Sequence, residues 1–150
     1  MARDDAALPA EIEAAALIPA PPEEVFEFLS DLGNHWRLTG RHVEVLSLNG
    51  DGTGGSVRIR GPLGLRRTAE TTVTAARNPR LMIGAAELSS GTRARVSWTL
   101  AGRLGQTRVR LAATVDHASP LDRLLLALGG RRWLSGLFER TLERLAERFG

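Results

Sequence analysis

Apolar and polar residues alternate over two long segments in the last third of the chain, residues 92–101 and 106–117. An alternation with a period of two places successive side chains on opposite faces of a strand, so both segments predict strands with one apolar face. The apolar positions of the two strands are Ala94, Val96, Trp98, Leu100, Val109, Leu111, Ala113 and Val115.

A helical pattern follows the second strand and continues to the end of the chain. Ser119 and Pro120 are typical of a helix start, because serine caps the first turn and proline suits the first helical position. Gly129 and Gly130 interrupt the pattern. The apolar residues recur three and four positions apart and predict one stripe that packs on the sheet. They are Leu121, Leu124, Leu125, Leu128, Trp133, Leu134, Leu137, Phe138, Leu142, Leu145 and Phe149.

The earlier part of the chain predicts one strand, two short helices and four further strands. The first strand covers residues 11–18, a helix beginning at Pro22 covers 22–31, and a short helical turn covers 35–40. The resulting order predicts an α+β fold, in which a curved antiparallel seven-stranded sheet wraps around the long C-terminal helix. The four further strands are expected at 43–48, 56–60, 66–77 and 81–88.

Length and composition fit one domain. The chain has 150 residues, of which 43% are hydrophobic and 25% are charged, and these values are ordinary for a globular protein. Residues 1–10 are expected to form a flexible tail and residues 11–150 a single domain. The chain has no cysteine and no apolar run near the ~20 residues of a membrane span, so no thiol chemistry and no integral membrane segment are expected. Its polar N-terminus does not resemble a secretory signal, and we expect a cytoplasmic protein.

Charge is unevenly distributed along the chain. Residues 1–31 contain one arginine and eight acidic residues, whereas residues 32–150 contain nineteen arginines and nine acidic residues. A basic surface of this kind can bind nucleic acid. However, no run of five like charges occurs, and aromatic residues make up only 5% of the chain. Base stacking and a continuous basic path are both unsupported, so no nucleic-acid partner is predicted.

The predicted inner face of the sheet contains almost no titratable group. Thr71 is its one polar strand residue, and His117 follows at the end of the same face. Small residues are frequent on this face and leave space, which favours an apolar pocket. The alternative is that the C-terminal helix packs closer and fills the space. The small residues are Ala14, Ala16, Ala69, Ala75, Ala94 and Ala113.

The segment Ile18–Asp31, IPAPPEEVFEFLSD, resembles the opening of the START-like (SRPBCC) superfamily of polyketide cyclase/dehydrase and lipid-transport proteins, which have a helix-grip fold. With the order of elements, the resemblance extends over residues 11–149. It implies a deep cavity between the sheet and the last helix, open near the short second helix, and a small hydrophobic molecule as partner. The expected lining is Trp36, Val57, Ile59, Val73, Val96, Trp98, Val109, Leu111, Trp133, Leu134, Leu137 and Phe138.

Four polar residues are candidates for catalysis if the cavity belongs to an enzyme. No catalytic motif of the family matches the chain. His35 and Trp36 lie in a loop-like stretch, where exposed aromatic residues often bind ligands, although a structural role is equally compatible with the pattern. No histidine has further ligands at metal spacing, so neither a metal nor a cofactor is predicted. The candidates are His35, Arg37, Thr71 and His117.

Three functions of different classes are compatible with these features. The first is binding of a small hydrophobic molecule such as a polyketide, a lipid or an isoprenoid. The second is a polyketide cyclase or aromatase that uses the same cavity. The third is a regulatory module that binds another protein through the arginine-rich sheet face or the last helix. One fold serves all three classes, so the fold does not choose among them; the sequence also leaves a homodimer open.

Overall fold

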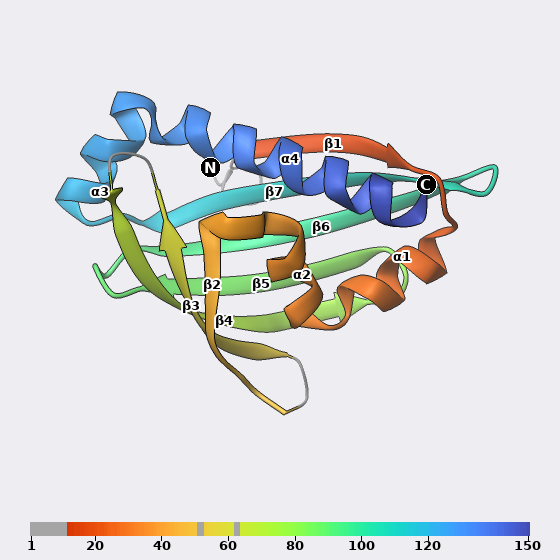
Figure 1. Ribbon diagram of the computed structural model, residues 1–150, viewed down its shortest axis with the longest axis horizontal. Helices are drawn as coiled ribbons and strands as arrows, with labels where there is room; N and C mark the ends of the chain where they lie inside the picture. The colour runs from red at the N-terminus through yellow and green to blue at the C-terminus, as the bar shows by residue number, and fades with distance from the viewer. Residues whose placement is uncertain (1–11, 51–52, 62–63) are drawn as a thin grey trace, which may run out of the picture.

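The computed structural model describes residues 12–50, 53–61 and 64–150 (Figure 1). Seven strands form one sheet in the order β1-β7-β6-β5-β4-β3-β2, and all neighbours are antiparallel. This confirms the predicted α+β architecture. The strands are β1 (Ile12–Ile18), β2 (Val43–Leu48), β3 (Gly54–Arg60), β4 (Arg66–Arg77), β5 (Leu81–Leu88), β6 (Arg93–Arg103) and β7 (Gln106–His117).

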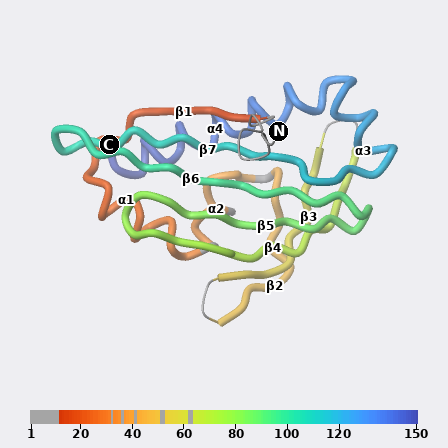
Figure 2. Tube along the Cα trace, turned by 180° about the vertical axis from the view of Figure 1, so that it is seen from behind, coloured from red at the N-terminus to blue at the C-terminus, as the bar shows by residue number. Residues whose placement is uncertain are grey.

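Cross-strand pairing aligns the apolar positions in rows across the sheet. In one row, Met82 pairs with Trp98, Trp98 pairs with Leu111, and Leu111 pairs with Ala14. Paired residues share a face, so the whole row faces the same side. Met82, Trp98 and Leu111 are buried. Helices α1, α2 and α4 all lie on this side of the sheet, as the opposite views in Figures 1 and 2 show.

One expected member of the inner face is exposed. The pairing of β4 with β5 is irregular between Val73 and Ala75. A bulge inserts one unpaired residue and shifts the in–out alternation that follows it. Ala75 is therefore exposed, and its predicted place on the inner face is wrong.

Two short helices follow β1. Helix α1 (Pro22–Leu29) begins with proline in its first turn, as predicted. Helix α2 (Leu32–Thr39) begins earlier than expected, because the Asp31 side chain accepts a hydrogen bond from the Gly33 N–H at 3.0 Å and caps the helix. The break between the helices therefore lies at Ser30 and Asp31, whereas the sequence pattern predicted it after Asp31.

The C-terminal helix consists of two parts joined at a kink. Helix α3 (Pro120–Leu125) leads through the turn η4 (Leu126–Gly130) into helix α4 (Arg131–Phe149). Gly129 has a φ of 126°, which residues with a side chain rarely adopt, and the chain changes direction there. The predicted interruption is thereby confirmed. Helix α4 packs mainly on β1 and α2, whereas α3 lies at one end of the molecule (Figure 1).

The kink removes part of the predicted apolar stripe from the core. Leu121, Leu124 and Leu128 are 56%, 53% and 74% exposed, so their predicted packing on the sheet is wrong. In α4, Leu137, Leu142 and Leu145 are buried as expected, at 5%, 1% and 0% exposure. The other members of the α4 stripe are half-buried, namely Trp133, Leu134, Phe138 and Phe149. The spacing of leucines cannot show that a glycine turns one half of the helix away.

Buried side chains form two separate clusters on the helix side of the sheet. The smaller cluster joins β2, β3 and β4 and consists of Val43, Val57 and Ala69. The larger cluster lies beneath α1, α2 and α4. It consists of Ile18, Ala20, Val25, Phe26, Leu29, Leu38, Met82, Trp98, Leu100, Val109, Leu111, Leu142 and Leu145.

Candidate functional site

Small side chains separate the two clusters on the concave face of the sheet. Ala86 of β5 pairs with Thr71 of β4 and with Ala94 of β6. Gly84, two residues before Ala86, pairs with Val96. Gly84, Ala86 and Ala94 belong to neither cluster, and glycine and alanine add little side-chain volume. The described core is therefore discontinuous at the centre of this face, at Gly84, Ala86 and Ala94. We call these three residues the small-residue region.

The predicted cavity lining divides into two groups by burial. Val57, Trp98, Val109, Leu111 and Leu137 are buried in the core. The side chain of Trp36 lies outside the part of the chain that the structure describes. The second group keeps partial contact with solvent, which leaves its apolar atoms accessible to a ligand. It consists of Ile59, Val73, Val96, Trp133, Leu134 and Phe138.

Trp133 links the beginning of α4 to the turn η2 (Gly40–His42). Its ring meets the His42 ring edge to face, with 5.5 Å between the centroids and an interplanar angle of 87°. Edge-to-face packing is a favoured arrangement of aromatic rings. The contact therefore packs the beginning of α4 against the turn η2.

His35 is buried in α2 and contacts Trp98. Its Nε2–H donates to the Leu29 carbonyl oxygen at 2.7 Å, because a carbonyl can only accept. The ring packs edge to face on Trp98 with 5.1 Å between the centroids. Burial lowers the pKa of His35, while the Leu29 carbonyl and the Asp31 charge act in the opposite direction. His35 is therefore a neutral residue in a helix, and not part of the exposed loop that the sequence suggested.

The burial of His35 predicts a loss of stability in mild acid. Its pKa is lowered by folding, so the unfolded chain takes up a proton first as the pH falls below about 6.5. The stabilisation is fully present above that pH and decreases below it. We expect urea unfolding to give a smaller free energy of unfolding at pH 5.5 than at pH 7.5. The His35→Gln protein should show a smaller difference between these two pH values. His117→Gln, which removes an exposed histidine, is the control variant, and an effect equal to that of His35→Gln would contradict the prediction.

Thr71 and His117 have different surroundings from His35. Thr71 is buried, and its Oγ1–H donates to the Gly55 carbonyl oxygen at 3.2 Å. His117 is exposed at the end of β7 and pairs with Arg93. Strands β4 and β7 are separated by β5 and β6, which corresponds to about 14 Å of sheet. The structure therefore does not bring these candidates together.

Two of the pockets on the described surface lie away from the predicted cavity lining. The first has a volume of about 380 Å³ and is lined by Phe28, Arg37, Leu38, Arg144, Glu147 and Arg148. The second has a volume of about 260 Å³ and is lined by Val115, Asp116, His117, Ala118, Arg123, Leu126 and Arg131. Neither contains a residue of the predicted cavity lining. The candidates Arg37 and His117 lie in different pockets.

Asp122 is the centre of a polar cluster that sequence reasoning missed. Its carboxylate accepts hydrogen bonds from Arg67 Nη2 at 2.8 Å, from Ser90 Oγ at 2.6 Å and from Thr92 Oγ1. Burial acts to raise the pKa of Asp122, but the hydrogen bonds from Ser90, Thr92 and Arg67 and the Arg67 charge outweigh it and lower the pKa to about 2. The Ser119 Oγ accepts the Asp122 N–H at 3.2 Å. All these groups have partners, so the cluster anchors α3 to the sheet.

The position of Asp122 in the sequence carried one usable signal. A serine cap followed three residues later by an acidic residue resembles a capping box. The pattern placed Ser119 correctly as the cap. It did not show that Arg67, Ser90 and Thr92 come from other parts of the chain to surround Asp122.

Neither a metal site nor a membrane-spanning helix is found among the described residues. No group of three histidine, aspartate or glutamate side chains is arranged to hold a metal ion in the described ranges. Within the same ranges, no helix is both long enough and apolar enough to cross a membrane.

Residues 9–150 match the model of the polyketide cyclase/dehydrase and lipid transport family. The chain belongs to this family. Membership confirms the resemblance drawn from Ile18–Asp31. The family description joins enzymes and carriers, so it does not decide between cyclase and transport functions. No curated protein sequence is significantly similar to this family member.

Solved structures share the fold of this family member. The protein TTHA0849 from Thermus thermophilus has a TM-score of 0.70 and 22% identity, with 92% of this chain and 95% of that chain covered. Ms6760 from Mycobacterium smegmatis has a TM-score of 0.65 and 15% identity, with 92% and 89% covered. DynU16, from the dynemicin biosynthetic locus, has a TM-score of 0.51 and 20% identity, with 88% and 46% covered. At these identities the similarity shows the fold alone.

Proposed function

We propose that this chain binds a small, mainly apolar molecule, such as a polyketide, a lipid or an isoprenoid, on the concave face of the sheet beside α4. One observation carries the proposal: apolar side chains of the sheet and of α4 that pack on the two clusters remain partly exposed. Val73, Val96 and Phe138 border the larger cluster, and Ile59 borders the smaller one. Apolar surface that gathers on a concave face and keeps contact with solvent is typical of a ligand site.

The polar groups of this face favour binding over catalysis. Thr107 of β7 donates its Oγ1–H to the Ala20 carbonyl oxygen at 2.7 Å, and Thr71 and His35 also donate to backbone carbonyls. An acid or base must reach the proton that it transfers. These three groups are held by the backbone instead, so they support a binding surface with fixed walls. A cyclase or dehydrase activity is supported by the family description alone.

Filling the small-residue region tests the proposal. Ala94 pairs with Ala86 and Val115 on the concave face, so Ala94→Trp would place a large side chain in the space assigned to the ligand. We expect the affinity for an uncharged apolar fluorophore, such as Nile red, to fall by about tenfold or more, which corresponds to about 1.4 kcal/mol. Fluorescence titration measures the affinity, and circular dichroism checks that the variant is folded.

The same strand offers a matched control. Ala101 is exposed and lies an odd number of residues from Ala94, on the opposite face of β6. Ala101→Trp should leave the affinity within about twofold of the original protein. Equal affinity in the Ala94→Trp and Ala101→Trp proteins would contradict the proposed site. Independently of these variants, mass spectrometry of molecules released from the purified protein would identify the natural ligand class.

A further inference from the structure

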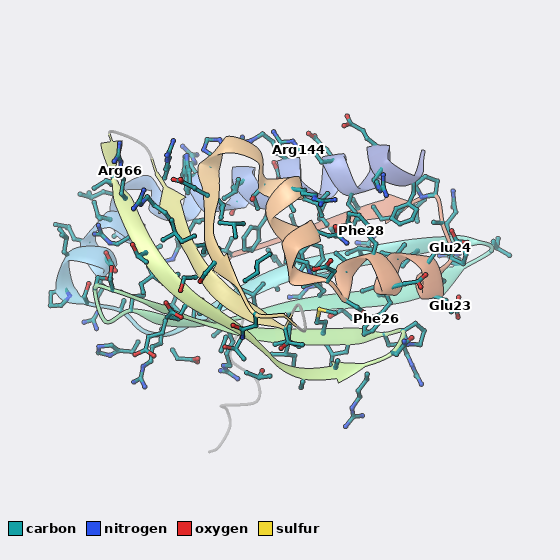
Figure 3. All side chains as sticks on the ribbon, turned by 60° about the horizontal axis from the view of Figure 1, so that its bottom comes forward. Glu23, Glu24, Phe26, Phe28, Arg66 and Arg144 are labelled. Carbon is teal, nitrogen blue, oxygen red and sulfur yellow. The ribbon has the colours of Figure 1, made fainter. Side chains whose placement is uncertain are left out.

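The pocket between α1, α2 and α4 contains a fixed guanidinium group. Arg144 Nη1–H donates to the Leu38 carbonyl oxygen at 2.7 Å. Leu38 is in the last turn of α2, where carbonyls lack partners within the helix and a positive charge is favourable. A Cβ atom at Gly40 would lie 3.0 Å from the same nitrogen, so the absence of a side chain there leaves room for Arg144. Figure 3 labels Arg144 and Phe28 on this side of the molecule.

A second guanidinium group is held by an aromatic ring. Arg148 lies over the Phe28 ring with 5.4 Å from its Cζ to the ring centroid. The Phe28 ring also meets Phe149 edge to face, with 5.8 Å between the centroids. A cation over an aromatic face is attracted by the ring quadrupole. Phe28 therefore positions Arg148 and also provides an apolar wall.

The third guanidinium group of the pocket belongs to Arg37. Among the described residues, Arg37 makes no hydrogen bond or ion pair, and neither does the Glu147 carboxylate, the one acidic group in the lining. Three guanidinium groups thus face a single carboxylate, and the pocket is positively charged. Each arginine has five N–H donors, so both Arg144 and Arg37 have donors left for a ligand.

We propose that this arginine pocket (Phe28, Arg37, Leu38, Arg144, Glu147 and Arg148) binds a small organic anion. The guanidinium groups match the planar oxygen pairs of a carboxylate or a phosphate. The Phe28 and Leu38 side chains suit a flat apolar body attached to that group. A volume of about 380 Å³ is within the range of small-molecule sites. The ligand class is therefore an aryl carboxylate or an aryl phosphate.

This site goes beyond the proposed function, because it shares no residue with the predicted lining of the concave face. Phenyl phosphate, benzoate and inorganic phosphate are suitable probes, with benzyl alcohol as the uncharged analogue. We expect calorimetric titration to detect phenyl phosphate and benzoate. Inorganic phosphate and benzyl alcohol should each bind about tenfold more weakly, because each lacks one half of the recognition. Raising the salt concentration should weaken the binding of the anions.

Arg37→Gln is the variant that tests the pocket, because Arg37 is exposed and its replacement removes no described contact. We expect it to weaken phenyl phosphate binding by about fivefold or more. Arg140→Gln, which also removes one arginine charge from an exposed position but lies outside the pocket, is the matched control. It should change the affinity by less than about twofold. NMR signals of Phe28 and Leu38 should shift during the titration.

Three outcomes would overturn the proposal. The first is undiminished phenyl phosphate binding by the Arg37→Gln protein. The second is an equal loss of phenyl phosphate affinity in the Arg37→Gln and Arg140→Gln proteins. The third is inorganic phosphate binding as tightly as phenyl phosphate. The Ala94→Trp protein separates this inference from the proposed function. It should bind phenyl phosphate normally whether or not it has lost the apolar fluorophore.

Discussion

Replacing Leu145 with alanine is expected to lower the free energy of unfolding by about 2–5 kcal/mol. Leu145 is 0% exposed and belongs to the larger core cluster beneath α4. Truncation removes buried apolar surface and leaves a cavity that the closely packed interior fills only in part. Alanine keeps the helix propensity high, so the loss would come from packing. Urea denaturation followed by circular dichroism measures the effect.

The same substitution at Leu128 is the matched control. Leu128 lies in the turn η4 and is 74% exposed, so Leu128→Ala should change the free energy of unfolding by less than about 0.5 kcal/mol. The two residues belong to one leucine pattern in the sequence. If both variants lost the same stability, the kink at Gly129 would not separate a buried half of the helix from an exposed half.

Replacing Asp122 with alanine is expected to lower the free energy of unfolding by about 3 kcal/mol or more at pH 7. Asp122 is 7% exposed and accepts hydrogen bonds from Arg67, Ser90 and Thr92. Its removal leaves a partly buried guanidinium group and two hydroxyl groups without their acceptor. The substitution should also release α3 from the sheet. Faster amide hydrogen exchange in α3 would report this release.

The low pKa of Asp122 also predicts a loss of stability in acid. Folding lowers the pKa of this carboxyl to about 2, and in the unfolded chain it is about 3.9. The stabilisation is fully present above pH 4 and is lost as the pH falls toward 2. It amounts to about 2–3 kcal/mol by linkage. Urea unfolding of the original protein at pH 5 and pH 3 should show the loss, and Asp122→Ala should show less of it.

Asp116 provides the control for the effect of Asp122→Ala at pH 7. It pairs with Arg95 at 2.8 Å, but the two side chains are 57% and 37% exposed for Arg95 and Asp116. Exposed ion pairs contribute about 0–1 kcal/mol, so Asp116→Asn should have a small effect at pH 7. A loss as large as that of Asp122→Ala would contradict the assignment of the Asp122 cluster as the anchor of α3.

Several strands were predictable with their boundaries because their signal is local. The segments 43–48, 66–77, 81–88 and 106–117 became β2, β4, β5 and β7 without change. Alternation reports which face of a strand is apolar, and Gly, Pro and Asn mark the turns between strands. The order of elements and the opening segment Ile18–Asp31 then indicated the family, which the match over residues 9–150 confirms.

The places where prediction failed depend on the backbone of neighbouring elements. The bulge before Ala75 depends on how β4 pairs with β5. A single-residue shift of this kind changes the direction of a side chain without changing the composition or the period of the segment.

By itself, the sequence determined the elements, the fold and the family of this protein. The tertiary structure decided which residues meet: His35 with Trp98, Asp122 with Arg67, and Arg37 with Arg144 and Arg148 in one pocket. It also decided that one half of the terminal leucine pattern is exposed. The physical reason is the distance along the chain over which each effect acts. Periodicity and capping act over a few residues, whereas burial and the partners of a charge depend on packing between segments far apart in the chain.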